Sequence, residues 1–319
     1  MKDVKISLES NELSQDEWWL ILFSLITDLP EEEWDSFVHD LIYKNRFFSS
    51  HKVVDVIRSF SEKCAETMKR GQVLYRARIY HQDPLKSFLS DVFKDSKEKK
   101  KVGDSVKLNK FFNMQLAAIM MALEKETPLG KQIVSAYGKW KRKRFKGYNS
   151  SESGAPPAEK ATLGRLNPEK VRYLYLAEDP YTAAYEVRPT IGQNVSIATF
   201  KTTADLKIYD FAKEIIFEEG DSPGQDYSLF GVIQQRFSEP NTGDSFMYLP
   251  TQYLGEIVKQ MGFDGIRFKS SLKNGGINLV LFDDKHCKAV CSEMLKVNDI
   301  EVKLSSPEIY QLEDLLNMH

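Results

Sequence analysis

The sequence predicts an α+β protein with a helical N-terminal domain, and three observations lead to this fold class. Apolar residues recur at helical spacing through residues 1–70, a strand-like alternation begins after Gly71, and helical and strand patterns mix from residue 164 onward. The chain has 319 residues, more than the roughly 250 at which one core usually stops growing. We therefore expect a helical domain over 1–71, a main domain over 72–295 with a helical insertion at about 84–147, and a helical tail over 296–319.

The N-terminal domain reads as three helices. Glu17 to Leu29 is apolar on nearly every side, which is typical of a buried helix. Pro30 and the three glutamates after it predict the start of a second helix, because proline fits the first turn and acids favour the positive end of the helix dipole. A third helix is expected from Val53 to Met68, ended by Gly71. Packing or partner contact is the expected role of this domain.

Residues 73–80 alternate as a strand does, with Arg76 and Arg78 on one face and the apolar residues on the other. Two neighbouring arginines repel each other unless solvent or an anion lies before them. The strand is therefore either a solvated edge strand or part of a phosphate site.

The stretch 84–147 returns to helical spacing, and its segment Lys107 to Leu123 has a core-facing stripe. The basic run 139–146 is interpreted as a solvated helix face, and nucleic acid is disfavoured as a partner because no known nucleic-acid module is present. Residues 149–157 have the composition of a loop.

The remaining chain alternates between predicted strands and helices. Helices are expected from Pro180 to before Pro189, over Thr251–Gln260 and over Ser306–Met318. Strands are expected over 173–177, 194–200, 206–211, 262–268 and 277–283.

Composition excludes several classes of protein. Lysine and arginine number 44 against 46 acids, so the net charge is −2 and a histone-like binder is disfavoured. The longest apolar run, Trp18 to Ile26, is too short to span a bilayer, and the first ten residues lack the apolar core of a secretory signal. Three cysteines suit a reducing compartment, so we expect a cytoplasmic protein with no membrane contact.

Familiar catalytic and metal motifs are absent from the sequence. It contains no dinucleotide-binding glycine fingerprint, P-loop, zincin helix or nucleophile elbow, and its five histidines are scattered. His286, Cys287 and Cys291 offer at most three clustered ligands, fewer than a structural zinc site usually needs. We therefore expect no metal.

Six short motifs nevertheless occur in one order along the chain. They are LYRARIY (74–80), GAPP (154–157), GRLNP (164–168), YLYLAEDPYTAAYEVRP (173–189), LPTQY (249–253) and GFDGIRFKSS with GGINLVLF (262–271 and 275–282). Over about residues 72–285 this pattern resembles the RES-domain family, named for an Arg, a Glu and a Ser, which includes toxins of bacterial Xre–RES toxin–antitoxin pairs.

The resemblance implies an ADP-ribosyltransferase-like fold with a split sheet, and an activity that degrades NAD by hydrolysis or phosphorolysis. NAD is then a substrate, no resident cofactor is needed, phosphate is a candidate co-substrate and an antitoxin protein is a candidate partner. Matched residue by residue, the family's catalytic groups fall on Arg76, Glu186 and Ser270, and substrate-binding groups on Tyr175, Arg78, Arg165 and Ser271. The adjacent Ser270 and Ser271 are not separable from sequence.

These residue types suit the chemistry. Breaking the nicotinamide–ribose bond develops positive charge on the ribose, which a carboxylate such as Glu186 stabilises. A guanidinium, expected from Arg76 facing Glu186 across a dinucleotide, binds phosphate with a planar fork of donors. Tyr175 can stack on nicotinamide, and Ser270 can donate a hydrogen bond to phosphate or ribose.

Two other functions remain open at this stage. The same cleft could transfer ADP-ribose to a protein or nucleic acid. Alternatively the chain could be a non-catalytic protein that binds nucleic acid through residues 139–146 or a partner through residues 1–70. The sequence does not choose between water, phosphate and a macromolecule as acceptor, nor does it give the oligomeric state.

Overall fold

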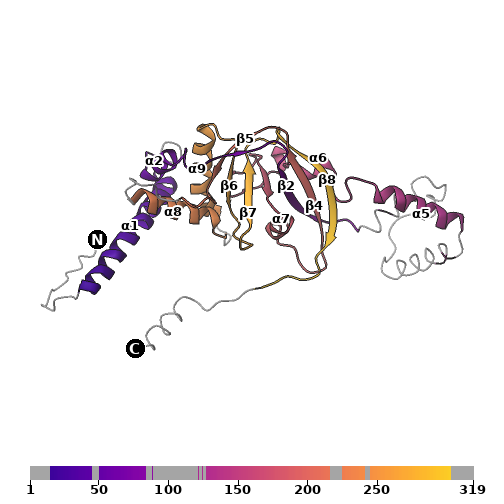
Figure 1. The fold of residues 1–319 in the computed structure, drawn as a ribbon, viewed down its shortest axis with the longest axis horizontal. Coiled ribbons are helices and arrows are strands. Elements are labelled where there is room, and N and C mark those ends of the chain that lie inside the picture. Colours follow the sequence, from indigo (N-terminus) through magenta and orange to yellow (C-terminus); the bar gives the residue numbers. More distant parts are fainter. Residues whose placement is uncertain are drawn as a thin grey trace, which may run out of the picture.

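The computed structural model describes residues 15–44, 50–83, 88, 121, 124, 127–215, 225–240 and 245–302. Over these residues the chain has an α+β fold, as predicted from its sequence. One large mixed sheet forms the centre, with α1, α2, α8 and α9 gathered at one end and α5 projecting at the other (Figure 1). The fold thus places the sheet between two helical regions.

The described residues form an eight-stranded sheet in which only β5 and β6 run parallel. Its strand order is β1-β5-β6-β7-β3-β2-β4-β8, which places β2 in the interior and excludes the solvated edge strand considered for residues 73–80. The strands are β1 (Ala65–Met68), β2 (Val73–Tyr80), β3 (Leu174–Ala177), β4 (Asn194–Thr202), β5 (Leu206–Asp210), β6 (Gly265–Lys269), β7 (Ile277–Leu281) and β8 (Cys287–Lys296).

The two faces of the sheet carry different elements. On one, Ala155, between α6 (Ser150–Ser153) and η2 (Ala158–Lys160), packs in one cluster with Leu74 of β2; we call it the α6 face. On the other, α7 (Pro180–Glu186) packs Ala183 against Ala77 of β2; we call it the α7 face. Because side chains alternate along a strand, consecutive residues of β2 lie on opposite faces.

The second helix was predicted to start at Pro30, and this is wrong. A single helix, α1 (Gln15–Tyr43), continues through Pro30. An internal proline removes one backbone hydrogen bond and costs about 3 kcal/mol. Pro30 is itself buried, and Trp34, Phe37 and Leu41 on the following turns enter the core, so packing offsets this cost.

The third helix is shorter than predicted. α2 (Lys52–Ser59) ends nine residues before Met68, and residues 65–68 instead form β1, paired with Leu206–Tyr209 of β5. Phe60 and Cys64 still reach the core from the turns between α2 and β1. Gly71, with φ of +88°, serves the turn between β1 and β2 and does not end a helix.

The N-terminal helices share one hydrophobic core with the main domain. Trp34 and Phe37 of α1 and Val53 of α2 belong to the same buried cluster as Phe237 of α8 and Val280 of the sheet. An ion pair of 3.2 Å between Lys52 and Asp226 also joins α2 to α8. A domain boundary at residue 71 stays a prediction. The helical layer comprises α1, α2, α8 (Gln225–Ser238), η3 (Ser245–Tyr248) and α9 (Leu249–Gln260).

The strands predicted from the sequence are confirmed as β2 to β7, and so are the helices α7 and α9. β8 was missed because only part of its side chains are buried, and α8 was not predicted. Within the predicted insertion 84–147, the structure describes chiefly α5 (Pro128–Lys141); most of Lys107–Leu123 lies outside the described residues, as do the side chains of 15–28 and all of 306–318.

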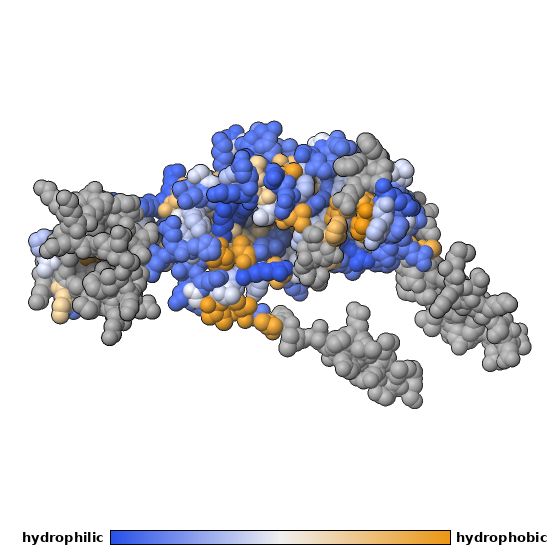
Figure 2. Space-filling model, turned by 180° about the vertical axis from the view of Figure 1, so that it is seen from behind, coloured by the Kyte–Doolittle hydropathy of each residue, from blue (hydrophilic) through white to orange (hydrophobic). Residues whose placement is uncertain are grey.

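The surface is largely hydrophilic in Figure 2, with an apolar patch where the described chain gives way to the grey C-terminal segment. Ile300 and Val302 are both exposed in that part of the chain. No helix among the described residues has the length and apolar character needed to cross a bilayer.

Candidate active site

A pocket of about 920 Å³ lies on the α7 face. β2, β3 and β7 form its floor, and α7 and the segments around residues 165, 248 and 271 surround it. It brings together most of the residues predicted from the motifs. Its polar or aromatic wall residues include Arg165, Tyr175, Glu186, Tyr248, Phe268, Ser271 and Asn278.

Glu186 is the last residue of α7, and the helix start fixes where it lies. Asp179 caps α7 by accepting hydrogen bonds from the backbone N–H groups of Tyr181 and Thr182, both at 2.9 Å. Pro180 follows in the first turn, where a missing N–H costs nothing. The seven-residue helix then ends with Glu186 at the pocket wall.

One oxygen of the Glu186 carboxylate is held by two donors. The Ser270 hydroxyl and the Asn278 side-chain amide each donate to Oε1 at 2.7 Å. The described residues supply no hydrogen bond to Oε2. The carboxylate is therefore oriented through one oxygen, and the other is available to a bound molecule.

The structure separates the two serines that the sequence could not. The Ser270 hydroxyl contacts Glu186 and also accepts from the backbone N–H of Leu272 at 3.2 Å, so it orients the carboxylate. Ser271 lines the pocket itself. A Cβ at Gly276, which closes this turn, would lie 2.5 Å from the Thr182 hydroxyl, so glycine allows the turn to approach α7.

Tyr175 reaches the pocket from β3, as predicted, and its hydroxyl has a structural role. That hydroxyl donates to Asn167 Oδ1 at 2.6 Å and accepts from the Leu166 N–H at 3.1 Å. Burial raises the pKa of Tyr175, so the phenol stays neutral. A Cβ at Gly164 would lie 2.6 Å from the same hydroxyl, which explains the glycine of the GRLNP motif.

Arg165 lies in the pocket near Glu186, and Arg188 lines the same pocket. Arg165 donates to the backbone carbonyls of Arg236, at 3.1 Å, and of Glu239. Its charge lies 5.6 Å from the ring centre of Tyr248 and 5.7 Å from that of Phe268. Burial lowers the pKa of Arg165, and nearby Tyr248 and Glu186 oppose that shift.

The LPTQY motif fastens the segment that carries Arg165. The Thr251 hydroxyl donates to the carbonyl of Arg165 at 2.7 Å. The Gln252 amide donates to the carbonyls of Gly164 and Asn167 at 2.8 and 3.0 Å. Two motifs that are distant in sequence therefore build one wall of the pocket.

Arg76 does not face Glu186 across the pocket, and that expectation is corrected. Its position in β2 contributes to the pocket wall, but its guanidinium donates to the carbonyls of Ser153, at 3.1 Å, and Gly154 on the α6 face. The reason is strand alternation, since Tyr75 and Ala77 occupy the α7 face. A catalytic role for Arg76 stays a prediction.

Arg78 lies on the same side as Arg76 and donates to the Gly154 carbonyl at 2.8 Å. Burial, and then the neighbouring charge of Arg78, lower the pKa of Arg76. Both guanidinium groups thus hold the GAPP segment against the sheet. A substrate-binding role for Arg78 also stays a prediction.

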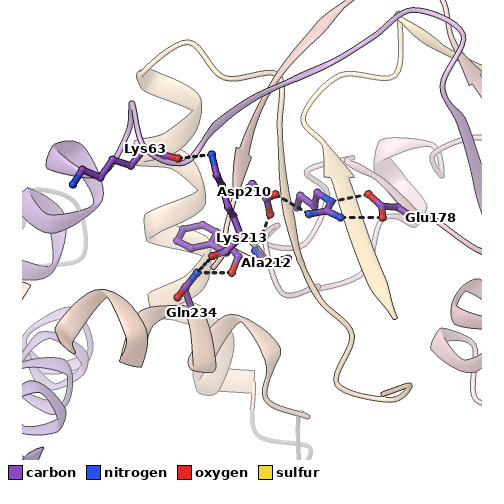
Figure 3. Close-up of polar contacts among 8 residues, drawn as sticks. Lys63, Glu178, Asp210, Ala212, Lys213 and Gln234 are labelled. Carbon is purple, nitrogen blue, oxygen red and sulfur yellow. Dashed lines mark hydrogen bonds and ion pairs between the residues drawn. The ribbon is translucent and has the colours of Figure 1, made fainter. Parts of the chain in front are cut away.

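The residues missed from sequence include Asn278, which lines the pocket, and Arg267, which lies outside its lining. Asn278 is a polar residue within the apolar strand of the GGINLVLF motif, and that contrast was the available signal. Arg267 of β6 pairs with Glu178, at 2.6 Å, and with Asp210, at 2.7 Å, which raises its pKa. Figure 3 labels the two acidic partners, Glu178 and Asp210, and marks these ion pairs with dashed lines. Because Glu178 precedes the cap of α7, Arg267 ties β5 and β6 to the helix of Glu186.

The described residues contain no group of three or more His, Cys, Asp or Glu side chains close enough to hold a metal ion. Cys64, Cys287 and Cys291 are all free thiols, and the first two are buried.

Comparison with known families adds to this geometry. The sequence model of the RES domain matches residues 137–304, slightly more than half of the 319-residue chain. The chain belongs to the RES domain family. In this RES protein the matched region contains Arg165, Tyr175, Glu186, Ser270 and Asn278, whereas α1, α2 and β2 with Arg76 lie before it.

A comparison of this sequence with curated proteins finds no match. Among solved structures, this RES protein is similar to a chain of the crystal structure of the M. tuberculosis MbcT–MbcA toxin–antitoxin complex. The identity is 13%, the alignment covers 82% of this chain and 95% of that chain, and the TM-score is 0.34.

Proposed function

We propose that this RES protein degrades NAD by breaking the bond between nicotinamide and ribose, through hydrolysis or phosphorolysis. The observation that carries the proposal is the Glu186 carboxylate, held through Oε1 by Ser270 and Asn278 in a pocket that also contains Arg165. A pocket of about 920 Å³ lies within the range of small-molecule sites and has room for a dinucleotide.

The carboxylate suits the charge that develops in this reaction. As the ribose C1′–N bond breaks, its electron pair passes to the nicotinamide ring and the ribose becomes an oxocarbenium-like cation. Glu186 stabilises that cation, directly or through the ribose 2′-hydroxyl. Nicotinamide leaves as a neutral molecule because the electron pair cancels the charge of its ring, so no strong general acid is required.

The acceptor completes the reaction. Water or phosphate adds through oxygen to C1′; water then loses a proton to solvent, and phosphate retains its negative charge. Arg165 supplies the guanidinium for an anionic group of the dinucleotide, the role that the sequence had assigned to Arg76. The Tyr175 ring and Ser271 complete the binding surface.

The family also favours a biological role. We propose that the chain is a growth-inhibiting toxin that acts on cytoplasmic NAD, with an antitoxin protein as its partner. Expression of wild type should arrest bacterial growth and lower cellular NAD, whereas Glu186→Gln, expressed at the same level, should do neither. Growth arrest by both proteins would refute NAD loss as the cause.

The acceptor is tested with the purified protein. NAD is incubated with and without phosphate, and nicotinamide and the ADP-ribose product are identified by mass spectrometry. Hydrolysis gives ADP-ribose in both cases; phosphorolysis gives its phosphorylated form and depends on phosphate. Label transferred from NAD to protein or nucleic acid would instead support ADP-ribosyl transfer, and absence of nicotinamide would favour a binding protein.

A further inference from the structure

The end of α8 holds the pocket arginine through its backbone. The carbonyls of Arg236 and Glu239, in and just after the last turn of the helix, each accept a hydrogen bond from the Arg165 guanidinium. Carbonyls at a helix C-terminus lack intrahelical donors and carry partial negative charge, so they suit a cation. The position of this turn therefore fixes the position of the Arg165 guanidinium.

The side chains of the same two residues connect the turn to α1. The Arg236 guanidinium pairs with Glu239 at 2.7 Å and with Glu31 of α1. Arg236 Nε is buried and has no partner among the described residues. The two carboxylates are therefore the ion-pair partners that fix this guanidinium, and one of them belongs to the N-terminal region.

Aromatic packing makes the connection stiff. Phe237 in this turn is fully buried and stacks on Phe211 with ring centres 4.1 Å apart. The ring centre of Phe237 also lies 6.4 Å from that of Phe268, and Phe268 is one of the two rings beside Arg165. Phe37 of α1 lies in the same core. A displacement of the turn would disturb both the polar and the aromatic contacts of Arg165.

We propose that α1 is part of the substrate-binding machinery: Glu31, through Arg236, positions the Arg165 guanidinium for an anionic group of the substrate. Glu31 and Arg236 are positioning residues, because neither lines the pocket. The inference rests on the proposed function for the identity of the substrate. It gives the N-terminal helices a role that the RES domain match, which begins at residue 137, does not cover.

The experiment compares Glu31→Gln with Glu32→Gln in the full chain. Glu32 is the adjacent, exposed acid, so the two variants change the charge of α1 equally. Glu31→Gln should weaken binding of NAD and of ADP-ribose about 3–10-fold, as expected for one misplaced charge-assisted contact, and leave kcat within about twofold. The Glu32→Gln protein should match wild type in its binding of NAD and ADP-ribose and in its kcat.

A double-mutant cycle excludes a purely structural effect. If Glu31 acts through Arg236, the double variant Glu31→Gln/Arg236→Gln should bind ADP-ribose no more weakly than Arg236→Gln alone. Additive losses, or a Glu31→Gln protein that binds as tightly as wild type, would overturn the inference. The ADP-ribose measurement reports binding alone, so it tests the inference even if no NAD is cleaved. Absence of nicotinamide release by wild type would count against the proposed function and not against this inference.

Discussion

The two faces of the sheet use arginine in opposite ways. On the α6 face, the guanidinium groups of Arg76 and Arg78 are turned to backbone carbonyls of residues 153 and 154. On the α7 face, Arg165 also donates to carbonyls, but it lines an open pocket beside Glu186. We infer from this difference a substrate-binding role for Arg165, whose charge lies near an acid and a space for a ligand, and a structural role for the two arginines of β2.

The first prediction tests the α7 face through its acid. Glu186→Gln should lower the rate of nicotinamide release about 10²–10³-fold, because the amide cannot stabilise a developing cation. The rate is measured under saturating NAD, and Glu159→Gln, at an exposed acid outside the pocket, serves as the matched control. A Glu186→Gln protein as active as this control would remove the carboxylate from the mechanism.

The second prediction sets one arginine against the other. Arg165→Gln should reduce kcat/KM about 10–100-fold, chiefly through KM, because a charge-assisted contact to the substrate is lost. Arg76→Gln should instead lower the free energy of unfolding by about 1–3 kcal/mol, because buried carbonyls lose their donor. Denaturant unfolding and steady-state kinetics are measured on both proteins. A stable but inactive Arg76→Gln protein would show that Arg76 acts on the substrate.

The third prediction concerns the pH dependence of the α7 face. Asn278→Asp places a second carboxyl within hydrogen-bond distance of Glu186. Two neighbouring carboxylates resist joint ionisation, which raises an apparent pKa of the pair. The acidic limb of the kcat profile should therefore move to higher pH by about one unit, so activity is lost earlier as pH falls. Asn278→Ala, which removes the donor without adding a carboxyl, should reduce kcat and move that limb less than Asn278→Asp does. An acidic limb at the same pH in the wild-type and Asn278→Asp proteins would contradict the orientation proposed for Glu186.

The smallest expected effects distinguish the serines. Ser270→Ala removes one of two donors to Glu186 and should reduce kcat about tenfold. Ser271→Ala should change mainly KM, by a few-fold, because Ser271 lines the pocket whereas the hydrogen bond to Glu186 comes from Ser270. Steady-state kinetics separate the two outcomes, and an effect on kcat confined to Ser271→Ala would reverse their roles.

Local patterns predicted much of the fold from sequence. Alternation located β2, the local sequence patterns also located β3 to β7, and the Asp179–Pro180 pair located the start of α7. Local rules failed where tertiary packing decided the outcome: Pro30 stays within α1 because its neighbours enter the core, and residues 65–68 leave the helix to pair with β5.

The candidate site was only partly predictable. The motifs named Glu186, Tyr175, Arg165 and both serines, and the structure brings them to one pocket or its edge. The sequence also placed Arg76 on the face opposite Tyr75, yet it could not show which face of the sheet α7 covers. The contacts of Asn278 with Glu186 and of Arg236 with Arg165 depend on tertiary structure, so no short motif reveals them.

The most direct measurement is a crystal structure of the Glu186→Gln protein with NAD bound. The account predicts that the nicotinamide-bearing ribose contacts residue 186 in the α7-face pocket and that Arg165 is the guanidinium nearest to the dinucleotide's phosphates. A dinucleotide bound on the α6 face, or one whose phosphates are held by Arg76 with the ribose far from residue 186, would contradict it.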